Sequence, residues 1–396
     1  MPGEPNRAIE ILAQLVSFDT TSHRSNLELI AFIEEYLARH GVVSQRIEND
    51  DGTKSNLLAT IGPARAGGVV LSGHTDVVPV TGQDWISDPF ELTARDVDGE
   101  ARQYARGSAD MKGFIAAVLD KVPALAAADL QTPVHIALSY DEEVGCLGVG
   151  RMIARLGDVV PMPALTIVGE PTNMQIVTAH KGIRGFETVF TGVAAHSSAP
   201  HLGANAIGFA AEFIAFLSGL ADEAEVAKMP ESGFTPPWTT FNAGQIEGGE
   251  ALNIIAERCV VSWEFRPLPD ADADAIETRV RAYLDDELRP RIKSVHPKAD
   301  VQLSPLAAVP PLRADPDSPA ERLVRHLTGA NTIHTVAYVA EASQFQQHGI
   351  PAVLCGPGDI AQAHQPDEWI AESEMDACAA FLDRLQDWCV SGAPVP

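Results

Sequence analysis

VVLSGHTDVVP, residues 69–79, is the stretch of sequence that decides the fold of this chain. A short apolar run, Val69 to Leu71, is followed at once by the turn-forming Ser72-Gly73 and then by His74. Apolar runs of this length, bounded by turn residues, are typical of buried strands in a parallel sheet. In open α/β sheets, ligands bind outside the carboxyl ends of the strands, so His74 lies where a functional group is expected.

Three further apolar runs end in polar residues of the same kind. Residues 136–140 precede Asp141-Glu142-Glu143, residues 165–168 precede Gly169-Glu170, and residues 352–354 precede a Gly/Pro loop that ends at His364. A fifth group, Asp110, opens a helix predicted to run to about residue 127. These side chains should converge on one rim of the sheet. Two imidazoles and three carboxylates suit a pair of zinc-like ions, so the predicted metal ligands are His74, Asp110, Glu143, Glu170 and His364.

Each candidate also has a plainer interpretation. Asp110 at a helix start is commonly an N-cap, and Asp141-Glu142-Glu143 would elsewhere be a solvated charge run. Directly after an apolar strand the second interpretation is weaker. Glu142 and Glu143 are adjacent, so one can ligate while the other remains free to act as a general base. Thr75 separates His74 from Asp76, so both side chains can point the same way. An Asp behind a ligating His would hold its tautomer.

Composition limits the class of protein. A chain of 396 residues is too long for one ordinary core and predicts two domains. No apolar stretch is long enough to span a bilayer and no signal pattern begins the chain, so we expect a soluble protein without a membrane partner. The five cysteines are odd in number and without CxxC spacing, which favours the cytoplasm. The net charge of −26 argues against nucleic acid as a partner and mainly indicates solubility.

The pattern along the chain changes after His180. Before it, strands and helices alternate as in an α/β layer fold, beginning with a helical region at 6–40 that is broken at 20–22. Between 185 and 303 the predicted order is strand, helix, strand, strand, helix, strand, which is ferredoxin-like. The α/β pattern resumes near residue 306. We therefore predict an α/β fold with a central, mostly parallel sheet flanked by helices, formed by residues 1–180 and 306–396, and an inserted α+β domain at 181–305.

Ten motifs carry a resemblance to a known family. They occur in order over essentially the whole chain: SGHTDVVP (72–79), DPF (88–90), YARGSADMKG (104–113), DEEVG (141–145), GEPT (169–172), AHKG (179–182), GVAAHSSAP (192–200), RPLP (266–269), EAS-QFQ (341–346) and GPGDIAQAHQPDEW (356–369). The chain resembles the di-zinc amidohydrolase and metallopeptidase family that includes acetylornithine deacetylase, succinyl-diaminopimelate desuccinylase, aminoacylase and carboxypeptidase G. Any one motif alone would be a weak match.

The resemblance implies a role for each matching residue. Asp110 bridges the two ions, His74 and Glu170 complete one site, and Glu143 and His364 complete the other. Asp76 orients His74, and Glu142 is the general base. His196 reaches the substrate oxyanion in the neighbouring subunit of a homodimer, so the insert would serve as a lid and dimerisation domain. Asn253 and Arg266 are implied contacts to the substrate amide and carboxylate. Zinc is the expected metal, and the same ligands would accept cobalt or manganese.

Within the family the resemblance is nearest to the acetylornithine deacetylases, through GPGDIAQAHQPDEW and WEFRPLP (263–269). It implies hydrolysis of N2-acetyl-L-ornithine in arginine synthesis, with Glu341 meeting the distal ammonium. One departure is that Glu341 follows Ala340, where that subgroup typically has Thr. A desuccinylase would need further cationic contacts, for which Lys181 and Arg184 are candidates. A dipeptidase remains an alternative. A non-catalytic binding protein is disfavoured because it would not need Glu142.

Overall fold

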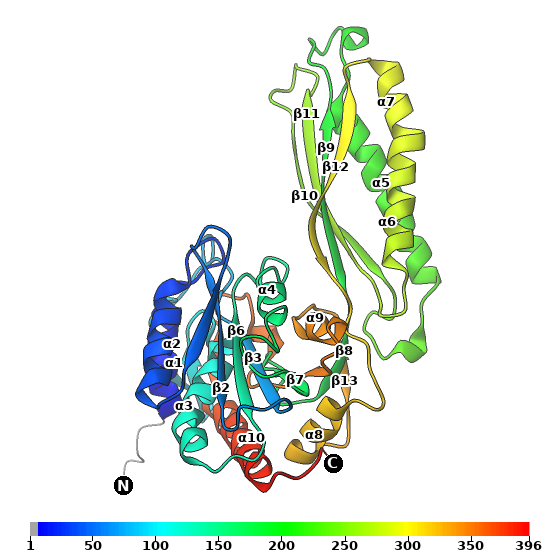
Figure 1. The fold of residues 1–396 in the computed structure, drawn as a ribbon. Coiled ribbons are helices and arrows are strands. Elements are labelled where there is room, and N and C mark those ends of the chain that lie inside the picture. The colour runs from blue at the N-terminus through cyan, green and yellow to red at the C-terminus, as the bar shows by residue number, and fades with distance from the viewer. Residues whose placement is uncertain (1–6, 396) are drawn as a thin grey trace. The chain divides into compact units, whose positions relative to one another are not determined.

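The computed structural model describes residues 7–395, which form two compact units. The second unit consists of His180–Leu312 and Thr335–Val339, and the first contains the remaining described residues. Figure 1 labels many of the elements of both. Those of the first unit are, in chain order, α1 (Arg7–Val16), α2 (Leu27–Arg39), β1 (Ser44–Glu48), β2 (Ser55–Ile61), β3 (Val69–His74), β4 (Thr93–Val97), β5 (Glu100–Tyr104), η1 (Ser108–Lys112), α3 (Gly113–Ala127), β6 (Val134–Ser139), α4 (Val149–Ile153), β7 (Leu165–Val168), β8 (Val177–His180), α8 (Pro319–Thr328), β13 (His334–Val336), α9 (Ala342–Gln347), β14 (Ala352–Leu354), η5 (Ile360–Gln362), β15 (Trp369–Ala371) and α10 (Glu372–Ser391). Strands β8 and β13 end in residues of the second unit.

The main sheet of the first unit has the strand order β1-β2-β6-β3-β7-β14-β8-β13. Its centre is parallel, because β6 and β7 both pair with β3 in that sense and β14 pairs with β7. Antiparallel pairs flank this centre at β2–β6 and β14–β8. The predicted mostly parallel sheet is confirmed. Parallel strands of this kind are covered on both faces, and accordingly every residue of β3, β6 and β7 is buried.

Helices cover both faces of this sheet (Figure 1). Alternate strand residues such as Leu57, Val69 and Ile136 pack with α1, α2, α3, α8 and α10 in one apolar core. Their neighbours Leu58 and Val70 point the other way and are also buried. On that face, α4 contacts β2 and β6, while α9 contacts β7 and β14. A small antiparallel sheet, β15-β5-β4, completes the unit.

The second unit contains a four-stranded antiparallel sheet with helices along one face (Figure 1). Its elements are β9 (Ile183–Thr191), η2 (Pro200–Leu202), α5 (Ala206–Val226), η3 (Pro230–Ser232), β10 (Thr240–Gly248), β11 (Arg258–Arg266), α6 (Ala273–Ala282), η4 (Tyr283–Leu288), α7 (Arg289–Val295) and β12 (Asp300–Val309). The sheet order β10-β11-β9-β12 with this chain order is ferredoxin-like, as predicted. Asn205 begins α5 by accepting the backbone N–H of Ile207 and Gly208.

The core of the second unit is aromatic, and this corrects one expectation. The apolar positions of a helix predicted at residues 205–220 led us to expect Phe213 and Phe216 to be buried between subunits, and for Phe213 this is wrong. Instead, Phe213 is fully buried inside its own unit and meets the Trp263 ring edge-on at 5.6 Å. Phe216 stacks on Tyr283 with ring centroids 3.8 Å apart. Their apolar spacing along α5 indicates a buried helix face, and such a pattern does not distinguish a core from an interface.

A helix that crosses a bilayer needs about 20 mostly apolar residues. Among residues 7–395, no helix is both long and apolar enough to cross a membrane.

Candidate metal centre

Four neighbouring parallel strands carry the predicted groups to one rim of the sheet. His74 ends β3, Asp141–Glu143 follow β6, Glu170 follows β7, and His364 lies beyond β14. The ends of β3 and β6 are level, because His74 is opposite Ser139 in the register. Asp110 comes from η1, just before α3 begins at Gly113. Its side chain caps no helix and instead contacts the two imidazoles.

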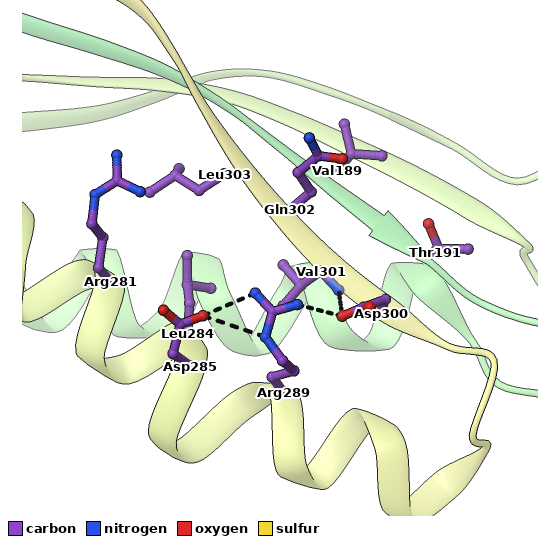
Figure 2. A pocket seen from close by; sticks show the side chains of 10 residues that line it. All are labelled: Val189, Thr191, Arg281, Leu284, Asp285, Arg289, Asp300, Val301, Gln302 and Leu303. Carbon is purple, nitrogen blue, oxygen red and sulfur yellow. Dashed lines mark hydrogen bonds and ion pairs between the residues drawn. The ribbon is translucent and has the colours of Figure 1, made fainter.

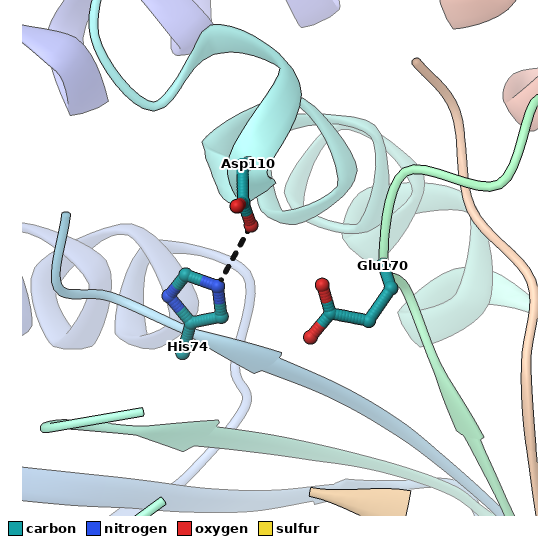
Figure 3. A group of neighbouring side chains, drawn as sticks. All are labelled: His74, Asp110 and Glu170. Carbon is teal, nitrogen blue, oxygen red and sulfur yellow. Dashed lines mark hydrogen bonds and ion pairs between the residues drawn. The ribbon is translucent and has the colours of Figure 1, made fainter. Parts of the chain in front are cut away.

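His74, Asp110 and Glu170 form one group whose candidate ligand atoms all lie within 4.8 Å of one another. Figure 3 shows the three side chains pointing toward one another. The His74 Nε2 atom lies 3.0 Å from Asp110 Oδ1. Glu170 is buried, and its Oε1 has no hydrogen-bond partner among the described residues. An unpaired buried carboxylate oxygen is costly unless a cation satisfies it, so this group fits a bound metal ion.

Asp110, Glu143 and His364 form a second group within the same 4.8 Å limit. The His364 Nε2 atom lies 2.9 Å from Glu143 Oε2 and 3.5 Å from Asp110 Oδ2. Asp110 therefore belongs to both groups and offers a different oxygen to each imidazole. A carboxylate shared in this way is the arrangement that two adjacent divalent cations require.

The protonation of these side chains reflects their crowding. Burial raises the pKa of Glu143 to about 7, and the negative charge of Asp110 adds to this effect. Hydrogen bonds to Asp110 and Glu143 raise the pKa of His364 to about 10. Burial opposes ionisation of Asp110, but its hydrogen bonds with His364 and His74 lower its pKa below the usual range. In the metal-free protein the imidazoles thus hold protons that a metal ion must displace.

Asp76 contacts His74 mainly through its main chain. The His74 Nδ1–H donates to the Asp76 carbonyl at 2.9 Å, whereas the nearest carboxylate oxygen of Asp76 is 3.7 Å away. This leaves Nε2 facing the ligand group. The Asp76 carboxylate accepts the backbone N–H groups of Glu142 and Glu143 at 3.0 and 3.3 Å, and the Ser22 hydroxyl at 2.7 Å. It therefore contacts the turn that carries these two glutamates.

Glu142 is half-buried and belongs to neither ligand group. Its Oε1 accepts the Cys146 thiol at 3.3 Å. Burial and the Glu142 charge raise the pKa of that thiol well above its ordinary value, so the thiol remains a donor. Burial likewise raises the pKa of Glu142 itself well above the usual range. A carboxyl group with a raised pKa is a suitable proton carrier near neutral pH.

Glu341 lies at the start of α9 and is 1% exposed. Neither carboxylate oxygen has a partner of good hydrogen-bond geometry among the described residues. Burial raises its pKa to about 7, against the opposing effects of the Ser139 hydroxyl and the His74 charge.

The remaining predicted residues belong to the second unit. His196 is exposed, and its Nδ1 accepts the backbone N–H of Ser198 at 3.2 Å. Asn253 is exposed, and its backbone carbonyl accepts the N–H of Ser197 at 2.9 Å. Arg266 is paired with Glu264 at 2.7 Å.

Two buried residues near the centre received no role from the sequence. Arg106 and Glu368 are each 1% exposed and form an ion pair at 2.6 Å. Glu368 also accepts the N–H of Asp110 at 3.0 Å. Removing one partner of a buried pair of this kind typically costs about 3–5 kcal/mol of unfolding free energy. Their one sequence signal is that each stands inside a motif that carries a metal ligand.

A separate pocket of ≈ 420 Å³ lies on the second unit between β12 and the helices (Figure 2). Its lining includes Arg289, which bonds both Asp285 and Asp300. None of the predicted site residues lines it, and these three charges already satisfy one another.

Known proteins resemble this chain in sequence and in fold. The sequence profile described as peptidase family M20/M25/M40 matches residues 70–387. Acetylornithine deacetylase from Aliivibrio salmonicida (strain LFI1238) is 33% identical over 376 residues, covering 94% of each chain. Acetylornithine deacetylase from Myxococcus xanthus is 35% identical over 379 residues, covering 94% of this chain and 95% of that protein. An M20 family metallo-carboxypeptidase from Sulfolobus solfataricus shares the fold with a TM-score of 0.76 and 18% identity, over 98% of this chain and 100% of the other.

These matches confirm the family that the ten motifs indicate, and with it the prediction that the protein is an enzyme. Since the profile covers most of the chain and the relatives span nearly all of it, this protein belongs to peptidase family M20/M25/M40 and is a hydrolase of its peptidase and amidohydrolase type.

Proposed function

We propose that this protein hydrolyses the amide bond of an N-acyl amino acid with the help of two divalent cations, and that the substrate is N2-acetyl-L-ornithine, which gives L-ornithine and acetate. One observation carries the proposal. Two ligand groups share Asp110, and Glu142 stands beside them as a carboxylate that belongs to neither. The named relatives, which are acetylornithine deacetylases, support the choice of substrate.

In this proposal His74, Asp110 and Glu170 hold one ion, and Asp110, Glu143 and His364 hold the other. Nitrogen and carboxylate ligands suit zinc, which we propose as the metal, and they would also accept cobalt. When bound, such a pair of cations supplies polarisation of the amide carbonyl and lowers the pKa of water. The unpartnered Oε1 of Glu170 supports this assignment, because a cation would satisfy it.

The protein's own side chains supply the proton transfers. Glu142 takes a proton from the attacking water and later donates it to the leaving amine nitrogen. The Cys146 thiol, by donating to Oε1 of Glu142, leaves the other carboxylate oxygen for the proton. His196 donates a hydrogen bond from Nε2–H to the oxygen that becomes negative. Because Ser198 already donates to Nδ1 of His196, a neutral ring carries its hydrogen on Nε2.

His196 belongs to the second unit, and we propose that it serves the site of a partner subunit in a homodimer. This proposal assigns residues 1–180 and 306–396 to the catalytic domain and residues 181–305 to an inserted lid and dimerisation domain. Asn253, whose carbonyl accepts the N–H beside His196, would contact the substrate amide. A cytoplasmic location is part of the same proposal, supported by five cysteines that are all free and buried.

The charges of the second unit suit a substrate with one carboxylate better than a succinylated one. Lys181 is fully buried and donates to the Trp238 carbonyl at 2.6 Å. Arg184 is paired with Asp274 at 2.9 Å. Lys181 is therefore not available for the additional carboxylate of a succinyl group, and Arg184, like Arg266, already has a carboxylate partner. Arg266 keeps a partly exposed guanidinium, which would bind the α-carboxylate.

Glu341 provides a test of the substrate. A buried carboxylate without a cationic partner is stabilised by an incoming ammonium group, and ornithine has one while methionine does not. Glu341→Gln should lower kcat/KM for acetylornithine about 10–100-fold, and should affect acetylmethionine much less. Assays in added zinc or cobalt, on both compounds and on succinyl-diaminopimelate and dipeptides, measure this preference. Glu91→Gln, which changes an exposed carboxylate, is the control. A preference of the unmodified protein for the succinylated compound or for dipeptides would refute the substrate.

Metal uptake should release protons. His364, with a pKa of about 10, is protonated near pH 8, and the pKa of His74 is raised as well, so binding of the ions should release protons there. Lowering the pH through 7 also protonates Glu143, so more protons must leave and the apparent affinity should fall. Calorimetric zinc titrations in buffers of different ionisation enthalpy measure the number released. Uptake that is independent of pH between 6 and 8 would contradict these ligands.

A further inference from the structure

Glu368 is joined to the backbone of a predicted metal ligand. Its Oε1 accepts the N–H groups of Ala109 and Asp110 at 2.9 and 3.0 Å, and its Oε2 accepts the Arg106 guanidinium at 2.6 Å. Arg106 and Glu368 stand 262 positions apart in the chain, and both are buried. Both oxygens of Glu368 are therefore used, and one of them contacts the segment that carries Asp110.

The contacts continue from Arg106 to a second predicted ligand. The other terminal nitrogen of Arg106 donates to Gln83 Oε1 at 2.6 Å, and Gln83 Nε2 donates to the His364 carbonyl at 2.8 Å. The same two loops are joined again where the Ile86 N–H donates to Asp367 at 3.1 Å. An unbroken series of side-chain hydrogen bonds thus runs from the backbone of Asp110 to the backbone of His364.

His364 needs such support more than the other ligands. Its side chain is 53% exposed, whereas the Asp110 and Glu143 side chains are 7% and 6% exposed. It lies in a loop beyond η5 with φ of 65°, a conformation uncommon for a residue with a side chain. Packing therefore restrains it less than a ligand at a strand end. Gln83 supplies a side-chain hydrogen bond to its main chain.

We propose that Gln83, Arg106 and Glu368 are positioning residues that set the separation of Asp110 and His364, and so determine how tightly the second of the two ions is held. The inference rests on the proposed di-metal function and deepens it. Outer partners of metal ligands commonly change metal affinity 10–100-fold. Gln83 acts on His364 alone, whereas Glu368 acts on Asp110, which both groups share. The three residues should therefore differ in which ions they affect.

Gln83→Met is the main test, since it keeps the length of the side chain and removes its hydrogen bonds with Arg106, Trp85 and His364. In titrations of the metal-free, full-length protein with Co²⁺, followed by visible absorption and elemental analysis, we expect one ion to bind about 10–100-fold more weakly and the other to bind as in the unmodified protein. Gln83→Glu, which retains an acceptor for Arg106 but has no donor for His364, should behave in the same way. Asp84→Asn, in the same exposed loop, should leave both affinities unchanged.

Two further variants distinguish positioning from general stability. Arg106→Lys keeps the charge beside Glu368 but cannot reach both partners, so it should reproduce the Gln83→Met pattern. Glu368→Gln should weaken both ions, because Asp110 serves both groups. Unmodified protein that binds two Co²⁺ ions, together with Gln83→Met protein of unchanged affinities, overturns the inference and leaves the proposed function standing. Unmodified protein that binds fewer than two ions overturns the metal centre and the inference together.

Discussion

Glu142→Gln is expected to lower the turnover number about 10²–10⁴-fold while both metal ions stay bound, because the change removes general-base catalysis and no ligand. The amide of Gln cannot take the proton of the attacking water. It is close to isosteric with the carboxylate, so the turn that carries it should persist. The backbone contacts of this turn with Asp76 do not depend on the Glu142 side chain. The Michaelis constant should change little.

Glu143→Gln is the matched control, since the neighbouring carboxylate belongs to the second ligand group. It should lose metal affinity as well as activity. Elemental analysis of both variants, with steady-state kinetics at saturating zinc, separates the two roles. If Glu142→Gln loses an ion, or keeps near-normal turnover, the assignment of the two glutamates is wrong. If instead Asp141-Glu142-Glu143 were a solvated charge run, neither change should matter.

His196→Ala should lower turnover about 10²–10³-fold, the effect typical of removing one donor to a developing oxyanion. Because we propose that His196 serves the partner's site, two inactive chains should restore each other. A heterodimer of His196→Ala and Glu142→Ala chains has one site with both groups and one with neither. When equal amounts exchange at random, about half of the dimers are mixed and each has one complete site. The mixture should therefore recover about a quarter of the activity of the unmodified protein.

The control for this experiment is the double variant that carries both changes in one chain, mixed with itself. It should recover nothing. Subunit exchange is verified by mass spectrometry of differently tagged chains. Absence of recovery after complete exchange would mean that His196 does not act across the subunit boundary. If His196→Ala protein by itself kept near-normal turnover, His196 would not be an oxyanion donor.

The central strands of the first unit could be predicted because their residues are mostly apolar. The runs at 69–71, 136–140, 165–168 and 352–354 become β3, β6, β7 and β14, which lie side by side with their polar ends at one rim. Such strands are buried on both faces, so local composition is enough to reveal them. The two ligand groups contain the same five residues that the strand ends and motifs indicate.

Boundaries were less predictable where local pattern is weak. The apolar pattern predicts a helix at 271–288 and a short strand at 301–303. In the structure the helix continues through η4 and α7 to Val295, and the strand extends over Asp300–Val309. Proline at 290 suggests a break, and it lies where the π-helical turn η4 passes into α7. The sequence pattern of the edge strand β12 is weak because several of its residues face solvent.

By itself, the sequence determined the α/β class, the ferredoxin-like order of the second unit and the residue types at the rim, because periodicity and motif chemistry are local properties of a chain. Only the tertiary structure decided which side chains meet across the fold. In the tertiary structure Arg106 pairs with Glu368, and Gln83 donates to the His364 carbonyl. The Asp76 carboxylate faces the backbone of Glu142 and Glu143 and not the His74 ring. The tertiary structure also buries Lys181 against the Trp238 carbonyl and Phe213 in a core. These contacts join residues far apart in the chain, and no local pattern encodes which distant partner will satisfy a buried polar group.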